Sequence, residues 1–235
     1  MNNRTVDRAL LRLSAALLLA GQLLYVVVTL LHTGGEANNH PAIFAAYAGS
    51  AIWTAVHVAQ FACMAIMLAG FLALFSALDG QAGTARFASR LGAASTTATL
   101  ALCGVVLAVD GVALERAVNA WANAPEAERA ARFASAEALR WLEWGSRSYE
   151  NFTLGLAVLF AAAVVRTARL SRPIAYVMVL SALAYLWQGW LAGSEGFSPA
   201  HTIAIVLTEA LNAVWMTWLL VVAWRNPAFN RASVD

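Results

Sequence analysis

The stretch from Ile52 to Leu78 reads IWTAVHVAQFACMAIMLAGFLALFSAL and contains no Asp, Glu, Lys or Arg over its 27 residues. A helix needs about 20 apolar residues to cross a hydrocarbon core that is roughly 30 Å thick. This stretch is therefore long enough to cross a bilayer, and it predicts a transmembrane helix. Five further stretches share its length and apolar character.

The composition of the whole chain agrees with lipid as its solvent. Of its 235 residues, 61% are hydrophobic and only 12% are charged, which is too little charge to cover the surface of a soluble domain of this size. We predict an all-α protein, an integral membrane bundle of six transmembrane helices in one domain over residues 1–235. The predicted spans are 10–31, 52–78, 91–114, 148–165, 174–192 and 202–224.

Region 115–147 is the only predicted connection that is larger than a turn. Pro125 followed by Glu126 and Glu128 is typical of a helix start. The spacing predicts an external amphipathic helix at about 126–144, which lies on the outer membrane surface or over the bundle and turns into the membrane near Gly145. Its role as a lid or as an interfacial spacer stays open.

The placement of arginine predicts the orientation, because short cytoplasmic loops are enriched in basic residues. All 15 basic residues are Arg, and ten of them fall on the side that holds the N-terminus, residues 79–90, residues 166–173 and the C-terminus. We therefore expect a multi-pass protein of a bacterial inner (plasma) membrane with both termini in the cytoplasm. The absence of Lys excludes Schiff-base chemistry, and a net charge of +2 gives no reason to expect nucleic acid.

Polar residues inside the spans are the main functional clue, because ionisable groups at membrane depth need a partner or a purpose. Five spans carry them toward their predicted external ends, whereas the cytoplasmic halves are nearly all apolar. The pattern indicates a polar cavity that opens outward; the alternative is a structural network that fixes helix register. The candidate catalytic residues are Glu209, Asp110, His57 and His201, and the candidate ligand-binding residues are Glu150, Asn151, Arg147, Glu143, Gln188, Asn212, Trp53, Trp187 and Trp215.

We expect Glu209 and Asp110 to handle protons and the two imidazoles to titrate near neutral pH. Helical spacing places Arg147 so that it can bridge Glu143 and Glu150, and a structural role is favoured for Arg147 and Glu143. The tryptophans either line a pocket for a hydrophobic ligand or belong to an interfacial aromatic belt.

Two imidazoles with one or two carboxylates would suit Zn²⁺ or non-haem Fe²⁺, and His57 with His201 could hold a haem. However, the sequence has no HxxxH, HExxH or ExxH spacing. We therefore expect no metal, and no cofactor is indicated. His32 and His40 are interpreted as hydrogen-bond donors at the membrane interface.

Several short stretches resemble a family of uncharacterised bacterial multi-spanning membrane proteins of about this length. They are His40-Pro-Ala-Ile-Phe-Ala-Ala-Tyr47, Trp53-Thr-Ala-Val-His57, Trp141-Leu-Glu-Trp-Gly145, Tyr149-Glu-Asn-Phe152 and Gly193-Ser-Glu-Gly-Phe197. The resemblance covers nearly the whole chain. It implies a multi-spanning fold and carries no activity that could be transferred.

The leading interpretation is a membrane protein that binds a small amphipathic molecule in the outward-facing cavity, with acid–base or metal-assisted chemistry. One alternative is a small proton-coupled transporter or channel in which Glu209 carries the proton. A transporter needs a polar path through the cytoplasmic half, where Asn212 is almost the only polar residue, so transport is the weaker hypothesis. A third interpretation is a structural or assembly subunit. The lipid bilayer is the expected partner, and the sequence does not predict an oligomeric state.

Overall fold

The computed structural model describes residues 6–79, 83–168 and 170–225, and the regular structure of these residues is entirely helical. Six helices are long and apolar enough to cross a membrane, which confirms the predicted all-α membrane bundle. The elements in chain order are α1 (Arg8–Thr29), α2 (His40–Ala48), α3 (Trp53–Leu78), α4 (Thr84–Ala108), the π-helix η1 (Val109–Leu114), α5 (Glu115–Ala122), α6 (Glu126–Thr167), α7 (Arg172–Glu195) and α8 (Pro199–Arg225).

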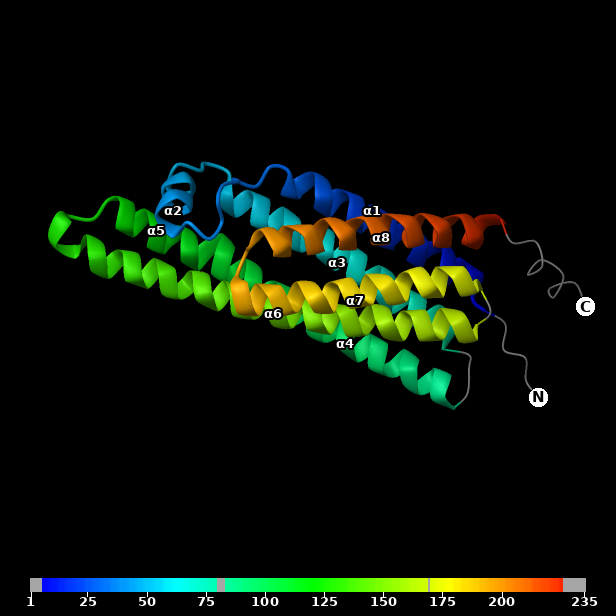
Figure 1. The fold of residues 1–235 in the computed structure, drawn as a ribbon. Helices are drawn as coiled ribbons and strands as arrows, with labels where there is room; N and C mark the ends of the chain where they lie inside the picture. The colour runs from blue at the N-terminus through cyan, green and yellow to red at the C-terminus, as the bar shows by residue number, and fades with distance from the viewer. Residues whose placement is uncertain (1–5, 80–82, 169, 226–235) are drawn as a thin grey trace, which may run out of the picture.

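The long helices run side by side along one axis, so the molecule is elongated (Figure 1). The described chain begins and ends at the same end of the bundle, where Arg12 Nε of α1 donates a hydrogen bond to the Ala223 carbonyl oxygen of α8 at 3.2 Å. We call this the termini end. The short helices α2 and α5 lie at the opposite end, which we call the α2–α5 end (Figure 1).

The helix α6 differs most from the sequence-based expectation. Its 42 residues join the predicted external helix and the predicted fourth span into one helix, which is about 63 Å long. The turn expected near Gly145 is absent, because helix-forming residues on both sides outweigh the cost of about 1 kcal/mol for one glycine. The first half of α6 therefore extends along α5 in a hairpin (Figure 1).

The third span is also longer than predicted. α4, η1 and α5 follow one another without a break from Thr84 to Ala122, where the sequence predicted a span of 91–114. The helix α2 was not predicted. It begins after Asn39, whose side chain accepts a hydrogen bond from Ala42 N at 3.4 Å, and Pro41 stands in its first turn, where the missing N–H costs nothing.

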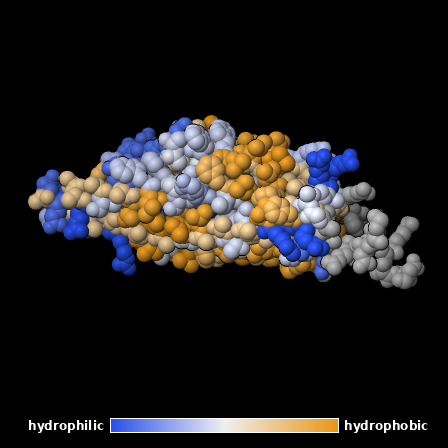
Figure 2. All heavy atoms as spheres, turned by 90° about the horizontal axis from the view of Figure 1, so that it is seen from below, coloured by the Kyte–Doolittle hydropathy of each residue, from blue (hydrophilic) through white to orange (hydrophobic). Residues whose placement is uncertain are grey.

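The middle of the molecule is suited to lipid. Large apolar side chains point outward from the spans, for example Val27 at 59%, Val58 at 64% and Ile203 at 62% exposure. Figure 2 shows hydrophobic residues along the middle of the elongated surface and the most hydrophilic residues at its two ends. The polar residues described below lie inside this bundle, where side chains meet other helices.

Candidate functional site

The π-helix η1 places Asp110 in the interior of the bundle. π-helical turns are rare and often mark functional sites, because a wider turn frees backbone carbonyls and re-aims side chains. Two residues of α3 bind the freed carbonyls: Trp53 Nε1 donates to Asp110 O at 2.9 Å, and Thr54 Oγ1 donates to Gly111 O at 3.1 Å. The Asp110 backbone is therefore held firmly against α3.

His57 of α3 meets the Asp110 carboxylate directly. Its Nε2 lies 2.9 Å from Asp110 Oδ2, and the His57 side chain is 2% exposed. The close approach depends on Gly111, because a Cβ at that position would stand 2.5 Å from His57 Cβ. His57 Nδ1 lies 2.7 Å from the Trp53 carbonyl oxygen.

His32, in the segment between α1 and α2, completes the group. Its Nε2 lies 3.9 Å from the same Asp110 Oδ2, and its Nδ1 lies 3.0 Å from Thr33 O. One ligand atom from each of His32, His57 and Asp110 falls within 4.8 Å of the other two. We call these three residues the His–His–Asp centre.

The hydrogen bonds of the centre fix the tautomers of both imidazoles. A carbonyl oxygen can only accept, so the Nδ1 atoms facing Trp53 O and Thr33 O must each carry a proton. In a neutral imidazole the Nε2 atom then has a free lone pair, and both Nε2 atoms face the Asp110 carboxylate. Lone pairs repel at the 2.9 Å separation of His57 Nε2 and Asp110 Oδ2, so a proton must lie between them, on His57 or on Asp110, or a metal ion must take its place.

The spacing of the ligand atoms suits a metal ion. Two ligand atoms that are each about 2.1 Å from a tetrahedral ion lie about 3.4 Å apart. The Nε2–Oδ2 separations of 2.9 and 3.9 Å lie on either side of that value. The other carboxylate oxygen, Asp110 Oδ1, is buried and has no hydrogen-bond partner among the described residues. A second metal contact, or a water bound to the metal, would satisfy it.

Aromatic rings enclose the centre. The Trp53 ring lies 4.6 Å from the His57 ring and 4.8 Å from the His32 ring, and the Tyr47 ring of α2 lies 4.0 Å from Trp53. Burial raises the pKa of the Tyr47 phenol, so the group stays neutral. His32 is 22% exposed and Asp110 is 6% exposed, which leaves the His32 side as the approach to the centre.

A second polar group lies deeper in the bundle, between α1, α7 and α8. Asn212 Nδ2 donates to Tyr185 OH at 2.8 Å and to Gln22 Oε1 at 3.3 Å. Gln22 Nε2 in turn donates to a carboxylate oxygen of Glu209. Asn212 Oδ1 accepts hydrogen bonds from Ser181 Oγ at 2.6 Å and from Trp215 Nε1 at 2.9 Å. We call these residues the amide network.

Two buried ion pairs lie along α6, and one of them differs from the prediction. Arg147 Nη1 binds Glu150 at 2.9 Å, as expected, but Glu143 binds Arg140 Nη1 at 2.6 Å instead of sharing Arg147. Arg140 lies within the predicted external amphipathic helix, yet it is only 2% exposed. It is buried because the straight α6 carries it beneath Tyr47 and Phe197, whose ring centroids lie 5.7 and 4.6 Å from the guanidinium carbon.

The other predicted site residues are dispersed. His201 is buried beside Phe197 at a ring distance of 5.1 Å and does not belong to the His–His–Asp centre. Asn151 and Gln188 are buried at 4% and 9% exposure, whereas Trp187 is 42% exposed on the outside of the bundle. The predicted set therefore divides, with His57, Asp110 and Trp53 at the centre and Glu209, Asn212 and Trp215 near the amide network.

Sequence reasoning missed His32, which it assigned to the interface. A signal was present in α1 and just beyond it, where Gln22, Tyr25, Thr29 and His32 follow one another at intervals of three, four and three residues, as on one side of a helix. Thr29 Oγ1 accepts a hydrogen bond from Gln60 Nε2 of α3 at 3.1 Å, one turn below His57. These four residues therefore lie along one line, which runs from Gln22 in the amide network to His32 in the His–His–Asp centre.

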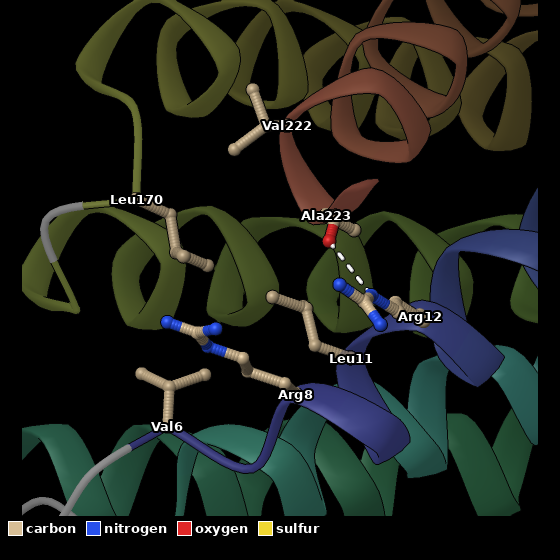
Figure 3. A pocket seen from close by; sticks show the side chains of 7 residues that line it. All are labelled: Val6, Arg8, Leu11, Arg12, Leu170, Val222 and Ala223. Atoms are coloured by element: carbon tan, nitrogen blue, oxygen red, sulfur yellow. Dashed lines mark hydrogen bonds between the residues drawn. The ribbon is translucent and has the colours of Figure 1, made fainter. Parts of the chain in front are cut away.

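Two pockets lie at the termini end. One of them, shown in Figure 3, is bounded by Val6, Leu11, Leu170 and Val222, with the side chain of Arg12 beside it. Its lining is apolar apart from arginine and offers no acid or imidazole. The outward-facing cavity expected from the sequence therefore stays a prediction.

No family model, curated protein or solved structure matches this chain. The geometry of the site therefore carries the functional argument alone.

Proposed function

We propose that this integral membrane protein is metal-dependent and that His32, His57 and Asp110 bind one divalent transition-metal ion. One observation carries the proposal. The Nε2 atoms of His32 and His57 both face the buried Asp110 carboxylate, while the Nδ1 atom of each imidazole lies within hydrogen-bond distance of a carbonyl oxygen. Nδ1–H groups that donate to carbonyls are the usual second shell of a histidine metal ligand. Two imidazoles and a carboxylate suit Zn²⁺ or Fe²⁺.

Three protein ligands would leave a coordination position open, which is typical of catalytic sites and not of structural ones. The ion would polarise a bound oxygen or water, and the exposed side of His32 gives a small molecule its approach. The proposal departs from the metal-free site expected from the spacing of the sequence, and it specifies the metal-assisted form of the small-molecule chemistry considered there.

Metal analysis tests the proposal. The protein should be purified in detergent without a polyhistidine tag, dialysed against Zn²⁺ or, under anaerobic conditions, Fe²⁺, and analysed for metal per chain. We expect one ion per chain in the wild type, and a fall in affinity of at least about tenfold in His32→Ala, His57→Ala and Asp110→Asn. His40→Ala and His201→Ala are matched controls, because these buried histidines lie outside the centre.

Wild-type protein that binds less than one ion per two chains would contradict the proposal. So would an equal loss of metal in all four histidine variants. The controls should retain the wild-type ion and the wild-type elution volume in gel filtration.

We also propose that the α2–α5 end faces the outside of the cell and that both termini are cytoplasmic. The ten-to-five distribution of arginine supports this orientation. The centre would then receive its metal and its small molecule from the extracytoplasmic side.

Thiol labelling tests the orientation. Cysteines at the exposed positions Gly34 and Ala127 should react with an impermeant maleimide in intact cells, and a cysteine at the exposed Thr84 should react only after lysis. The native Cys63 and Cys103 are buried and give a low background. Labelling at Thr84 with protection at Gly34 and Ala127 would reverse the orientation.

A further inference from the structure

We propose that Glu209 is a proton-exchange site that opens to the lipid at the seam between α1 and α8. The lipid side favours the neutral, protonated acid, and the amide network favours the carboxylate that remains when the proton leaves to water. This inference does not depend on the metal centre, which shares no residue with it.

The position of Glu209 gives it contact with lipid. It stands in the third turn of α8, and its neighbour Val206 on the preceding turn is 63% exposed on the apolar outer surface. Glu209 itself is partly buried, between the outward face and the side of α8 that packs on α1. Glu209 therefore stands at the boundary between the outward apolar face of α8 and the packed interior.

The surroundings offer Glu209 no cation. None of the ion pairs formed by the described residues includes it. The titratable groups near it are the phenols of Tyr25 on α1 and Tyr185 on α7, and a phenol carries no charge near neutral pH. Arg147 is bound to Glu150 at 2.9 Å. A charged carboxylate without a counter-ion is costly in hydrocarbon, so these surroundings favour the neutral acid.

The amide network stabilises the charged carboxylate form of Glu209. The indole of Trp215 can only donate, so the Asn212 atom 2.9 Å from Trp215 Nε1 must be the carbonyl oxygen. Asn212 Nδ2 then donates to Gln22, and the Gln22 atom it meets must be the carbonyl oxygen Oε1. The remaining atom, Gln22 Nε2, is consequently a donor to Glu209. One indole thus fixes the direction of both amides.

All donors in this chain of hydrogen bonds point toward Glu209. Aligned N–H dipoles stabilise a negative charge at the end of the chain, and a hydrogen bond to a charged group contributes about 1.5–3 kcal/mol. The lipid favours the neutral acid and the network favours the carboxylate, so both protonation states are supported. A group that is supported in both states can exchange its proton, which is what proton-coupled chemistry or transport requires.

A hydrophobic carbodiimide tests this assignment, because it dissolves in the bilayer and reacts with protonated carboxyl groups. Wild-type protein in liposomes should be treated with dicyclohexylcarbodiimide over a range of pH, and the adducts located by peptide mass spectrometry. We expect the adduct at Glu209, with a yield that falls as the pH rises. The buried but arginine-paired Glu143 and Glu150 are internal controls and should stay unmodified.

Two variants sharpen the test. Glu209→Gln keeps an acceptor for Gln22, so it should fold as the wild type does and give no adduct. Gln22→Leu removes the N–H donor, so the pH at which labelling is half-lost should rise by about one unit or more. Equal labelling of Glu143 and Glu150, or an absence of adduct at Glu209 at every pH, would overturn the inference. A Gln22→Leu profile identical to the wild type would overturn the role of the network.

Discussion

Arg140→Met is expected to destabilise the protein by about 3–5 kcal/mol, because it strands the Glu143 carboxylate in the bundle. Both side chains of this ion pair are 2% exposed and the contact is 2.6 Å long. The substitution also removes the guanidinium from the Phe197 ring, which adds about 1 kcal/mol. Equilibrium unfolding in mixed micelles measures the free energy of unfolding.

The double variant Arg140→Met, Glu143→Leu is the control. Removal of both charges leaves no uncompensated ion, so it should recover most of the lost stability. If the single variant unfolds at the same denaturant concentration as the wild type, Glu143 does not need its partner and the described packing of α6 is wrong.

Gly111→Ala is expected to disrupt the His–His–Asp centre while the rest of the bundle stays assembled. The added Cβ would stand 2.5 Å from His57 Cβ, which forces η1 and α3 apart. Overpacking of this kind costs about 1–3 kcal/mol, and it moves Asp110 away from His57. We therefore expect a lower melting temperature and a loss of metal affinity of at least about tenfold.

Gly104→Ala is the matched control in the same continuous helical segment. A Cβ at Gly104 would meet its closest atom, in the Phe61 ring, at 3.7 Å, which is an ordinary contact. This variant should keep the metal and gain slightly in stability, since alanine favours a helix over glycine by about 1 kcal/mol. Equal behaviour of the two alanine variants would show that close packing at Gly111 is unimportant.

The sequence predicted the six spans because hydrocarbon imposes a length and an apolar composition on any helix that crosses it. It also predicted the start of α6, since Pro125, Glu126 and Glu128 favour a helix N-terminus whatever the length or direction of the helix that follows. The straight course of α6 was not predictable in the same way. Gly145 marked a plausible turn, but the helix-forming residues on both sides, together with packing against α5 and α7, keep the helix continuous.

The His–His–Asp centre was only partly predictable. His57 and Asp110 stood out as ionisable residues in apolar spans, but their pairing depends on η1, and a periodicity of 3.6 residues does not describe a π-helical turn. The helical interval from Thr29 indicates the side of the chain on which His32 lies. However, His32 lies beyond the end of α1, so this interval does not determine its contact with Asp110. Its position depends on the course of the chain between α1 and α2, which hydrophobic patterning does not determine.

The partner of Glu143 shows a similar limit. Arg140 precedes Glu143 by three residues and Arg147 follows it by four, and both spacings bring helical side chains together. The sequence offers no reason to prefer Arg140 or Arg147 as the partner of Glu143. The burial of Arg140 selects it as the partner, because Tyr47 and Phe197 from other parts of the chain cover its guanidinium.

The central claim is that His32, His57 and Asp110 bind one metal ion. X-ray absorption at the zinc edge of the zinc-loaded protein tests it most directly, because the spectrum reports the ligands of the ion itself. We predict a shell of nitrogen and oxygen atoms with two imidazoles, at about 2.0–2.2 Å, and a clear loss of one imidazole contribution in His32→Ala. A wild-type spectrum with no imidazole contribution, or one that His32→Ala and His57→Ala leave unchanged, would contradict the claim.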